Sequence, residues 1–356
     1  MSFSHRSEPA AGSQARGGTA EPSPTAFRAA AVATTVAALV LVAVGGAVRA
    51  TDSGLACPDW PKCYGLWIPP ADLNIWLEHS HRLIAGVVGL MTLGLALWTA
   101  GRHRRADLLW PALGALVLVT AQAGLGALVV LHLLRADLVT AHLGMAMAVV
   151  ACLIYLSVNA TVPRLPRDQR AARDLRFPRA NAAVAGLTYL QILVGGHVTG
   201  IGAGLAFGLE GFPLFGGSVV PPIGSEREAF HVAHRFLAFA LAGAVLWLCA
   251  LAARHRGRLV ADGLWSARHR WLVRLPMLAA TLVAVQIILG VANIAGQLSF
   301  VTVIPHLAVA SWIWALLVLC TTLAYRLAPE RDLRIATGDE PDLLEAMPAA
   351  GVGDGS

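Results

Sequence analysis

The feature that most constrains this chain is the length of its uncharged apolar runs. The longest extends from Leu275 to Tyr325, 51 residues without Asp, Glu, Lys or Arg. As a single helix it would be about 76 Å long, whereas the hydrocarbon core of a bilayer is about 30 Å thick. The polar segment 293–299 interrupts this run. The run therefore predicts two membrane-spanning helices with a break between them.

The composition excludes several other classes of protein. Hydrophobic residues make up 56% of the 356 residues and charged residues only 13%, whereas a typical soluble domain has about 25% charged residues. Five cysteines and the lack of a Gly-x-y period exclude disulfide scaffolds and collagen. The apolar runs are continuous, whereas the strands of a transmembrane barrel alternate between apolar and polar residues.

We therefore expect an all-α polytopic membrane protein with eight transmembrane helices. Their predicted ranges are 27–48, 77–100, 108–131, 139–161, 181–202, 230–252, 272–294 and 302–326. The polar ends, 1–26 and 327–356, are expected to be disordered tails.

The distribution of arginine predicts the orientation in the membrane. Fourteen arginines fall in the loops 101–107, 162–180 and 253–271, whereas the intervening loops hold few cations, among them Lys62, Arg135 and Arg227. Because Lys and Arg are enriched in cytoplasmic loops, the arginine-rich loops and both termini are expected in the cytoplasm. This topology accounts for the net charge of +6 without a nucleic-acid partner.

Several short motifs occur twice, in the same order, in the two halves of the membrane region. Gly45-Gly46 recurs as Gly195-Gly196, His81-Arg82 as His234-Arg235, Gln122…Gly126 as Gln286…Gly290, and His142-Leu143 as His306-Leu307. The repetition predicts two pseudo-symmetric four-helix bundles, at 27–161 and 181–326, joined by a cytoplasmic linker at 162–180.

Four repeated histidines are the strongest candidates for function. His81, His142, His234 and His306 are each predicted about one turn inside the outer end of an even-numbered helix. Ionisable residues within spans are costly and commonly functional. Two imidazoles facing each other in a bundle core suit bis-histidine ligation of haem iron. Zinc is less favoured because it takes four ligands, and the alternative is hydrogen bonding between helices.

Glu78 makes the two halves chemically different. It precedes His81 by three residues and so shares its helical face, whereas the second half has His231 at this position. A carboxylate in a low-dielectric site can accept protons or stabilise positive charge. The alternative is a solvated residue at a helix start. Arg82 and Arg235 are candidates for binding haem propionates, or for anchoring the helices at the interface.

The first outer loop contains Cys57 and Cys63 around Pro-Asp-Trp-Pro-Lys. On the oxidising side of the membrane they are candidates for a disulfide, either structural or redox-active. His132 and His197 have no counterpart in the repeat, and we interpret them as polar packing residues.

Taken together, these motifs resemble the bacterial haem A synthase family. The resemblance covers about 27–326. It rests on Gly45-Gly46…Arg49-Ala-Thr-Asp-Ser-Gly54, Cys57-Pro-Asp-Trp-Pro-Lys-Cys63, Glu78-His-Ser-His81-Arg82, His142, His231-Val-Ala-His234-Arg235 and His306.

The resemblance implies oxidation of a ring methyl of the substrate haem O to the formyl group of haem A. It places haem O between His81 and His142 with Glu78 as the catalytic carboxylate, and a permanent haem b between His234 and His306. It also implies a Cys57–Cys63 disulfide, a bacterial plasma-membrane location, a haem O-producing farnesyltransferase as partner, and an electron acceptor.

Two other classes of protein fit part of the pattern. A dihaem electron-transfer protein linked to quinone would use the same four histidines without modifying haem, and a haem transporter would bind haem transiently. The absence of a second Glu78 favours chemistry in one half over symmetric electron transfer. Transporters typically have broken helices at the membrane midplane, whereas these histidines are predicted near the outer surface.

Overall fold

The computed structural model describes residues 23–103, 105–162, 175–209, 212–213, 215, 217–219, 221–263, 265 and 267–327. In these residues the chain forms α1 (Thr25–Ala50), α2 (Leu73–Trp98), α3 (Ala106–Leu131), α4 (Ala136–Thr161), α5 (Arg176–Gly200), α6 (Glu226–Ala261), α7 (Arg270–Ala295) and α8 (Phe300–Arg326), and the short π-helix η1 (Thr99–His103) continues α2. All eight α-helices are long and apolar enough to cross a membrane. The predicted all-α polytopic fold is confirmed, including the break near 293–299.

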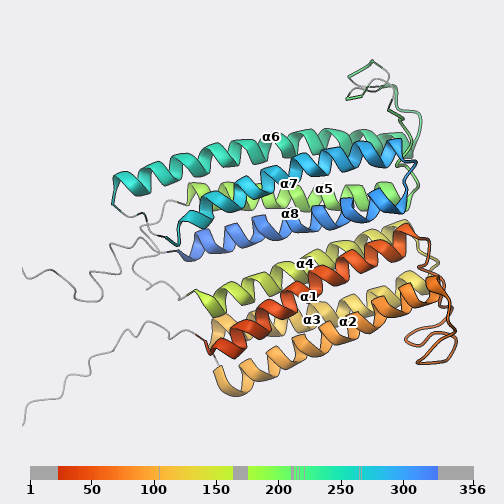
Figure 1. Ribbon diagram of the computed structural model, residues 1–356, viewed down its shortest axis with the longest axis horizontal. Helices are drawn as coiled ribbons and strands as arrows, with labels where there is room; N and C mark the ends of the chain where they lie inside the picture. The colour runs from red at the N-terminus through yellow and green to blue at the C-terminus, as the bar shows by residue number, and fades with distance from the viewer. Residues whose placement is uncertain are drawn as a thin grey trace, which may run out of the picture.

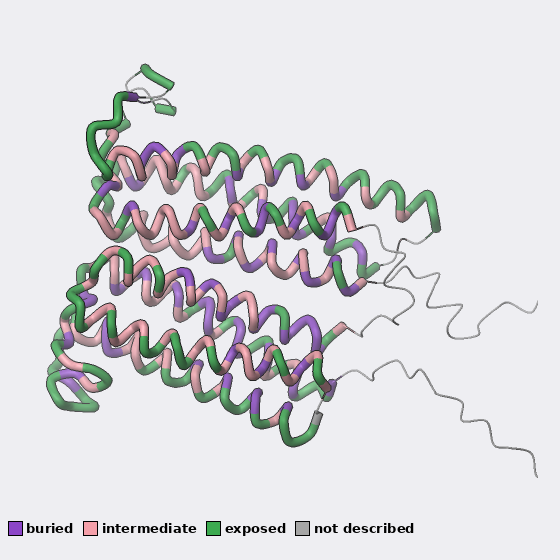
Figure 2. The backbone as a smooth tube through the Cα atoms, turned by 180° about the vertical axis from the view of Figure 1, so that it is seen from behind, coloured by how far each residue is buried: buried purple, intermediate pink, exposed green. Residues whose placement is uncertain are grey.

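The helices run alongside one another in two groups of four, α1–α4 and α5–α8 (Figure 1). The groups meet through contacts of α1 with α8, α4 with α5, and α4 with α8. Buried positions lie mostly between helices, and much of the outer surface is exposed apolar side chains, as expected for helices in lipid (Figure 2). The predicted tails and linker fall largely on 1–22, 163–174 and 328–356, which lie outside the described residues.

Several helices are longer than predicted. Asp72 caps α2 by accepting from the backbone N–H groups of Asn74 and Ile75, so the helix begins four residues early. Helix α6 continues to Ala261 instead of ending near 252. Three arginines that we predicted in a loop therefore lie on a helix, since Arg, Leu and Ala favour helix even beyond the membrane; they are Arg254, Arg256 and Arg258.

Two glycines and a tryptophan make close contacts between the groups. A β-carbon built on Gly46 of α1 would lie 2.7 Å from Leu307 of α8, and one on Gly196 of α5 would lie 2.9 Å from Leu143 of α4. Trp314 Nε1 in α8 donates to the backbone carbonyl of Met147 in α4 at 3.1 Å. The second glycine of each repeated Gly-Gly pair thus packs against the opposite group.

Candidate functional site

The four candidate histidines lie on α2, α4, α6 and α8, farther from the first residue of their helix than predicted. They follow the first residue of their helix by six to eight positions, which is roughly 9–12 Å at 1.5 Å per residue. The estimate of one turn was too shallow because each helix begins before its predicted first residue, where Asp72, Ser225 and Ser299 cap three of them. The set consists of His81, His142, His234 and His306.

Each histidine ring packs against a glycine on the preceding helix. A β-carbon on the glycine would lie 2.9 Å from His81 Cε1 at Gly45, 3.1 Å from His142 Cε1 at Gly126, 2.8 Å from His234 Cε1 at Gly195, and 3.4 Å from His306 Cε1 at Gly290. A side chain at Gly45, Gly126 or Gly195 would push against the ring, whereas 3.4 Å at Gly290 is an ordinary van der Waals contact. The first three glycines thus set how closely the imidazole approaches the neighbouring backbone.

The histidines form two pairs. His81 and His142 lie within electrostatic range of each other, as do His234 and His306. Interhelical hydrogen bonding was the alternative reading of these residues. The rings of His81 and His306 face the backbone carbonyls of Leu41 and Gln286, and His234 contacts the side chain of Gln191 in α5. A histidine that uses one ring nitrogen in this way has the other available for haem iron.

Two glutamines connect the histidine-bearing helices to their neighbours. Gln191 Nε2 donates to the backbone carbonyl of His234 at 3.1 Å and also lies 3.1 Å from Nδ1 of that ring. Gln122 Nε2 donates to the backbone carbonyl of His142 at 3.0 Å. The contact of Gln191 with Nδ1 helps to fix the orientation of the His234 ring, whereas Gln122 holds only the backbone of His142.

Glu78 is buried and held on both carboxylate oxygens. Its exposed fraction is 3%, so it is not the solvated helix-start residue of the alternative reading. Oε2 accepts from the backbone N–H of Cys57 at 2.8 Å, and Oε1 lies 2.5 Å from Nη2 of Arg82. The carboxylate is thereby fixed between α2 and the first outer loop.

Arg82 binds the first outer loop as well as Glu78. Its Nη1 donates to the carbonyls of Asp59 and Lys62 at 2.5 and 2.7 Å, and Nη2 approaches the Cys57 carbonyl at 3.5 Å. Both terminal nitrogens of the guanidinium are therefore engaged by protein groups.

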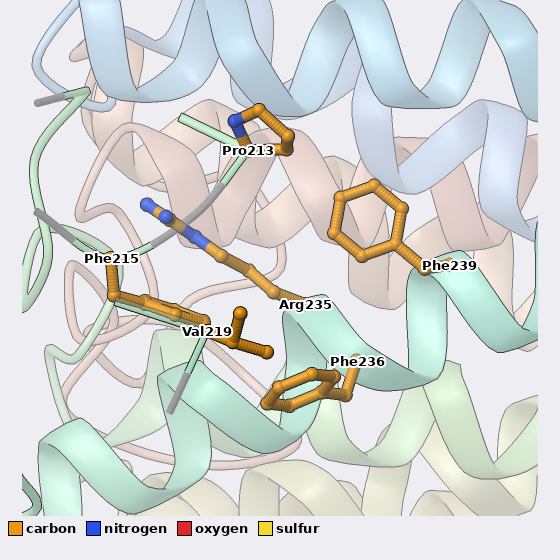
Figure 3. A pocket seen from close by; sticks show the side chains of 6 residues that line it. All are labelled: Pro213, Phe215, Val219, Arg235, Phe236 and Phe239. Atoms are coloured by element: carbon orange, nitrogen blue, oxygen red, sulfur yellow. The ribbon is translucent and has the colours of Figure 1, made fainter. Parts of the chain in front are cut away.

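The second half has a neutral histidine and an arginine, in place of the ion pair, at the corresponding position. His231 Nδ1 donates to the Ala203 carbonyl at 2.8 Å, which leaves Nε2 to accept from Nε of Arg235 at 3.0 Å. Arg235 Nη2 donates to the carbonyls of Phe207 and Gly208. Its buried Nη1 has no hydrogen-bond partner, and Figure 3 shows the guanidinium extending toward Phe215 in an apolar pocket.

Cys57 and Cys63 are joined by a disulfide, as predicted, and both are fully buried. Asp59 lies between them in the sequence and accepts from the backbone N–H groups of Tyr64 and Gly65 at 2.6 and 2.7 Å. The N–H of Gly65 foremost, with that of Tyr64, lowers the pKa of Asp59 below its ordinary value. The disulfide loop is thus held by hydrogen bonds to the carboxylate of its own residue Asp59 and by hydrogen bonds from Arg82 on α2.

Comparison with known proteins identifies the family. Residues 28–318 match the family model of the cytochrome oxidase assembly protein COX15-CtaA. The chain belongs to this family.

Relatives of this COX15-CtaA protein carry the name haem A synthase. That of Symbiobacterium thermophilum is 30% identical over 308 residues, which cover 82% of this chain and 93% of the relative. Those of Rhizorhabdus wittichii and of Methylobacterium sp. are 28% and 31% identical, and the alignments cover 83% and 73% of this chain and 93% and 81% of the relatives. The resemblance inferred from the motifs is confirmed.

Three site features of this COX15-CtaA chain were not predicted. We used the repeated glycines only to align the two halves of the sequence and did not predict their contacts with the histidines. Their constant position relative to the histidines could have indicated these contacts. Gln191 has no partner in the repeat as we aligned it, so nothing in the sequence distinguished it. His79, two residues before His81, was overlooked; it is 1% exposed and lies beside the disulfide.

Proposed function

We propose that this chain is a haem A synthase that oxidises a ring methyl of haem O to the formyl group of haem A. The relatives of that name and the pair of histidines in each half support this function. The observation that carries it is Glu78, a buried carboxylate three residues before His81 that has a neutral histidine in its place in the second half.

In the proposed N-terminal site His81 and His142 are the iron ligands of the substrate haem O. The iron supplies the redox chemistry of methyl oxidation. Conversion of the methyl to a formyl group with an oxygen atom from water would release four protons and four electrons. Glu78 would accept protons from the reacting carbon, and the proposed electron acceptor would take the electrons. Arg82 holds Glu78 in its orientation at 2.5 Å, and burial would strengthen the field of the carboxylate on positive charge at the porphyrin.

In the proposed C-terminal site His234 and His306 hold a resident haem b, and Gln191 orients the His234 ring. Arg235 has a buried Nη1 without a hydrogen-bond partner, so it is proposed to bind a haem propionate. If Arg82 bound a propionate in the same way, it would have to give up a hydrogen bond to a loop carbonyl or its ion pair with Glu78. We therefore assign Arg82 first to the positioning of Glu78.

The remaining parts of the proposal concern location and partners. The chain is placed in the bacterial plasma membrane with both termini in the cytoplasm, on the distribution of arginine. The farnesyltransferase that makes haem O and an electron acceptor are its proposed partners. The N- and C-terminal groups of helices are proposed to act as the catalytic and haem b domains, 27–161 and 181–326.

The test is expression in a host that makes haem O and no haem A, followed by chromatography of the extracted haem. Haem A is expected from the parent protein and from Glu226→Ala, which alters an exposed glutamate on α6, and not from Glu78→Ala. Bound haem b without haem A from the parent protein would instead indicate a dihaem electron carrier.

The haem b site has its own test. Reduced-minus-oxidised spectra of His234→Ala and His306→Ala are expected to lose the haem b signal. A normal haem b spectrum in both variants would contradict the assignment of this pair.

A further inference from the structure

Three potential metal ligands converge under the first outer loop. The Sγ atoms of Cys57 and Cys63 and a ring nitrogen of His79 all lie within 4.8 Å of one another. All three residues are buried, at 0%, 0% and 1% exposure. The cluster is separate from the histidine pairs that are proposed to hold haem.

The hydrogen bonds of His79 leave one nitrogen available to a ligand. Nε2 lies 2.9 Å from the backbone carbonyl of Trp67. A carbonyl only accepts, so Nε2 carries the proton and Nδ1 of the neutral ring presents a lone pair. That Nδ1 is buried and has no hydrogen-bond partner. Histidines that bind metals commonly donate their other N–H to a backbone carbonyl in this way.

We propose that, when the Cys57–Cys63 disulfide is reduced, Cys57, Cys63 and His79 form a binding site for a thiophilic metal ion, Cu(I). Two thiolates and one imidazole are soft to intermediate donors, which bind Cu(I) and zinc. A zinc site with three protein ligands keeps a water in its fourth position, whereas these three residues are buried at 0%, 0% and 1% exposure, which favours Cu(I). A closed zinc site takes four protein ligands, and the cluster contains three among the residues that the structure describes. The two sulfur atoms are bonded to each other at 1.96 Å in the disulfide, so they have to separate on reduction, while His79 already lies within 4.8 Å of both.

The redox step balances with a dithiol as reductant. A dithiol protein gives two electrons and two protons to the disulfide, forms its own disulfide, and leaves two thiols on Cys57 and Cys63. Binding of Cu(I) then releases the thiol protons, since the thiolate is the ligand. In the reverse exchange a protein disulfide takes two electrons from Cys57 and Cys63, becomes a dithiol, restores the Cys57–Cys63 bond and expels the ion. The disulfide and the metal site therefore exclude each other.

The test uses the full-length protein, with its haem, purified in detergent. One sample is reduced anaerobically with a phosphine and freed of it, and a second sample stays oxidised. Mass spectrometry after alkylation verifies that two additional thiols are present. Each sample is then titrated with the Cu(I) complex of bathocuproine disulfonate, and the copper transferred per chain is measured. The oxidised sample contains the same haem-site histidines and so controls for them.

One Cu(I) per chain is expected in the reduced sample and none in the oxidised one. Cys57→Ser and Cys63→Ser are expected to abolish this difference, and Cys152→Ser, a free cysteine on α4, is expected to retain it. His79→Phe keeps an aromatic ring against Trp76 and both thiols, and is expected to weaken Cu(I) binding at least about tenfold. X-ray absorption of the parent protein is expected to show two sulfur ligands and one nitrogen ligand.

Other results would overturn the proposal. These are equal copper binding by the oxidised and reduced samples, unchanged affinity in His79→Phe, or displacement of Cu(I) by equimolar Zn(II). If His79→Phe does not fold, sulfur-only coordination in the absorption spectrum of the parent protein would also contradict it.

Discussion

Arg82 holds the Glu78 carboxylate at 2.5 Å and, with the same guanidinium, the carbonyl oxygens of Asp59 and Lys62. A single side chain therefore connects the proposed catalytic carboxylate to the loop closed by the disulfide. The connection is buried, since Glu78 and Arg82 side chains are 4% and 11% exposed. Any movement of this loop is expected to change the environment of Glu78.

Arg82→Leu is expected to destabilise the protein by about 3–5 kcal/mol, because it removes the counter-charge of the buried Glu78 carboxylate. The double variant Glu78→Gln/Arg82→Leu is expected to recover part of this loss. Thermal unfolding in detergent measures both effects. Simple additivity of the two single variants would contradict a direct coupling.

Alanine at the glycines beneath the histidines is expected to displace the rings. Gly195→Ala would place a β-carbon 2.8 Å from His234, whereas a β-carbon at Gly186 on the same helix meets nothing within 4 Å. Overpacking of this kind costs about 1–3 kcal/mol, so haem b affinity should fall about tenfold or more in Gly195→Ala and stay unchanged in Gly186→Ala. Haem absorbance per chain measures this.

The same comparison is available in the first half of the chain. Gly126→Ala would crowd His142 at 3.1 Å, and Gly124 on the same helix is unobstructed. Gly126→Ala is expected to lower the yield of haem A while the haem b spectrum stays normal. Gly124→Ala should alter neither, and a loss of haem b in Gly126→Ala would contradict separate sites.

Gln191→Leu removes the group that holds the His234 ring. Loss of such a partner typically weakens metal binding about 10–100-fold. We expect reduced haem b occupancy and a shifted reduction potential, measured by redox titration. Gln297→Leu, an exposed glutamine that bonds only locally, serves as the control and should match the parent protein.

Asp59 makes the order of the disulfide loop dependent on acid. Because its folded-state pKa is lowered, its stabilisation is present above the ordinary aspartate pKa and is lost as the pH falls through the lowered value. In Asp59→Asn the disulfide is therefore expected to be accessible at neutral pH. In the parent protein it is expected to become accessible only in acid. The rate of disulfide reduction by a phosphine, followed from pH 7 to pH 3, tests this.

Much of the fold was predictable because lipid imposes a simple constraint on sequence. A span needs about 20 apolar residues, so the number of helices and the break near 293–299 follow from the charge-free runs. Helix ends were less accurate: α6 extends to Ala261 because water beyond the membrane does not terminate a helix of good helix formers. Hydropathy identifies the part of a helix that crosses the membrane, but it does not show how far the helix continues beyond the membrane.

The candidate site was predictable only where residues are chemically distinctive. The four histidines and Glu78 were conspicuous because ionisable groups in spans are costly. The loop partners of Arg82 could not be predicted, because they are backbone carbonyls and any residue type can supply a backbone carbonyl. His79 was overlooked for another reason: its role depends on the loop bringing two cysteines next to it, which sequence spacing does not indicate.

The two groups of helices share one further dependence. Leu307, next to His306, occupies the space over Gly46 of α1, and Leu143, next to His142, occupies the space over Gly196 of α5. In each half, a glycine thus makes room for the leucine that follows the histidine of the other half. A substitution at Gly46 or Gly196 is therefore expected to reach the histidine of the opposite half as well as its own, although neither glycine lies in that half.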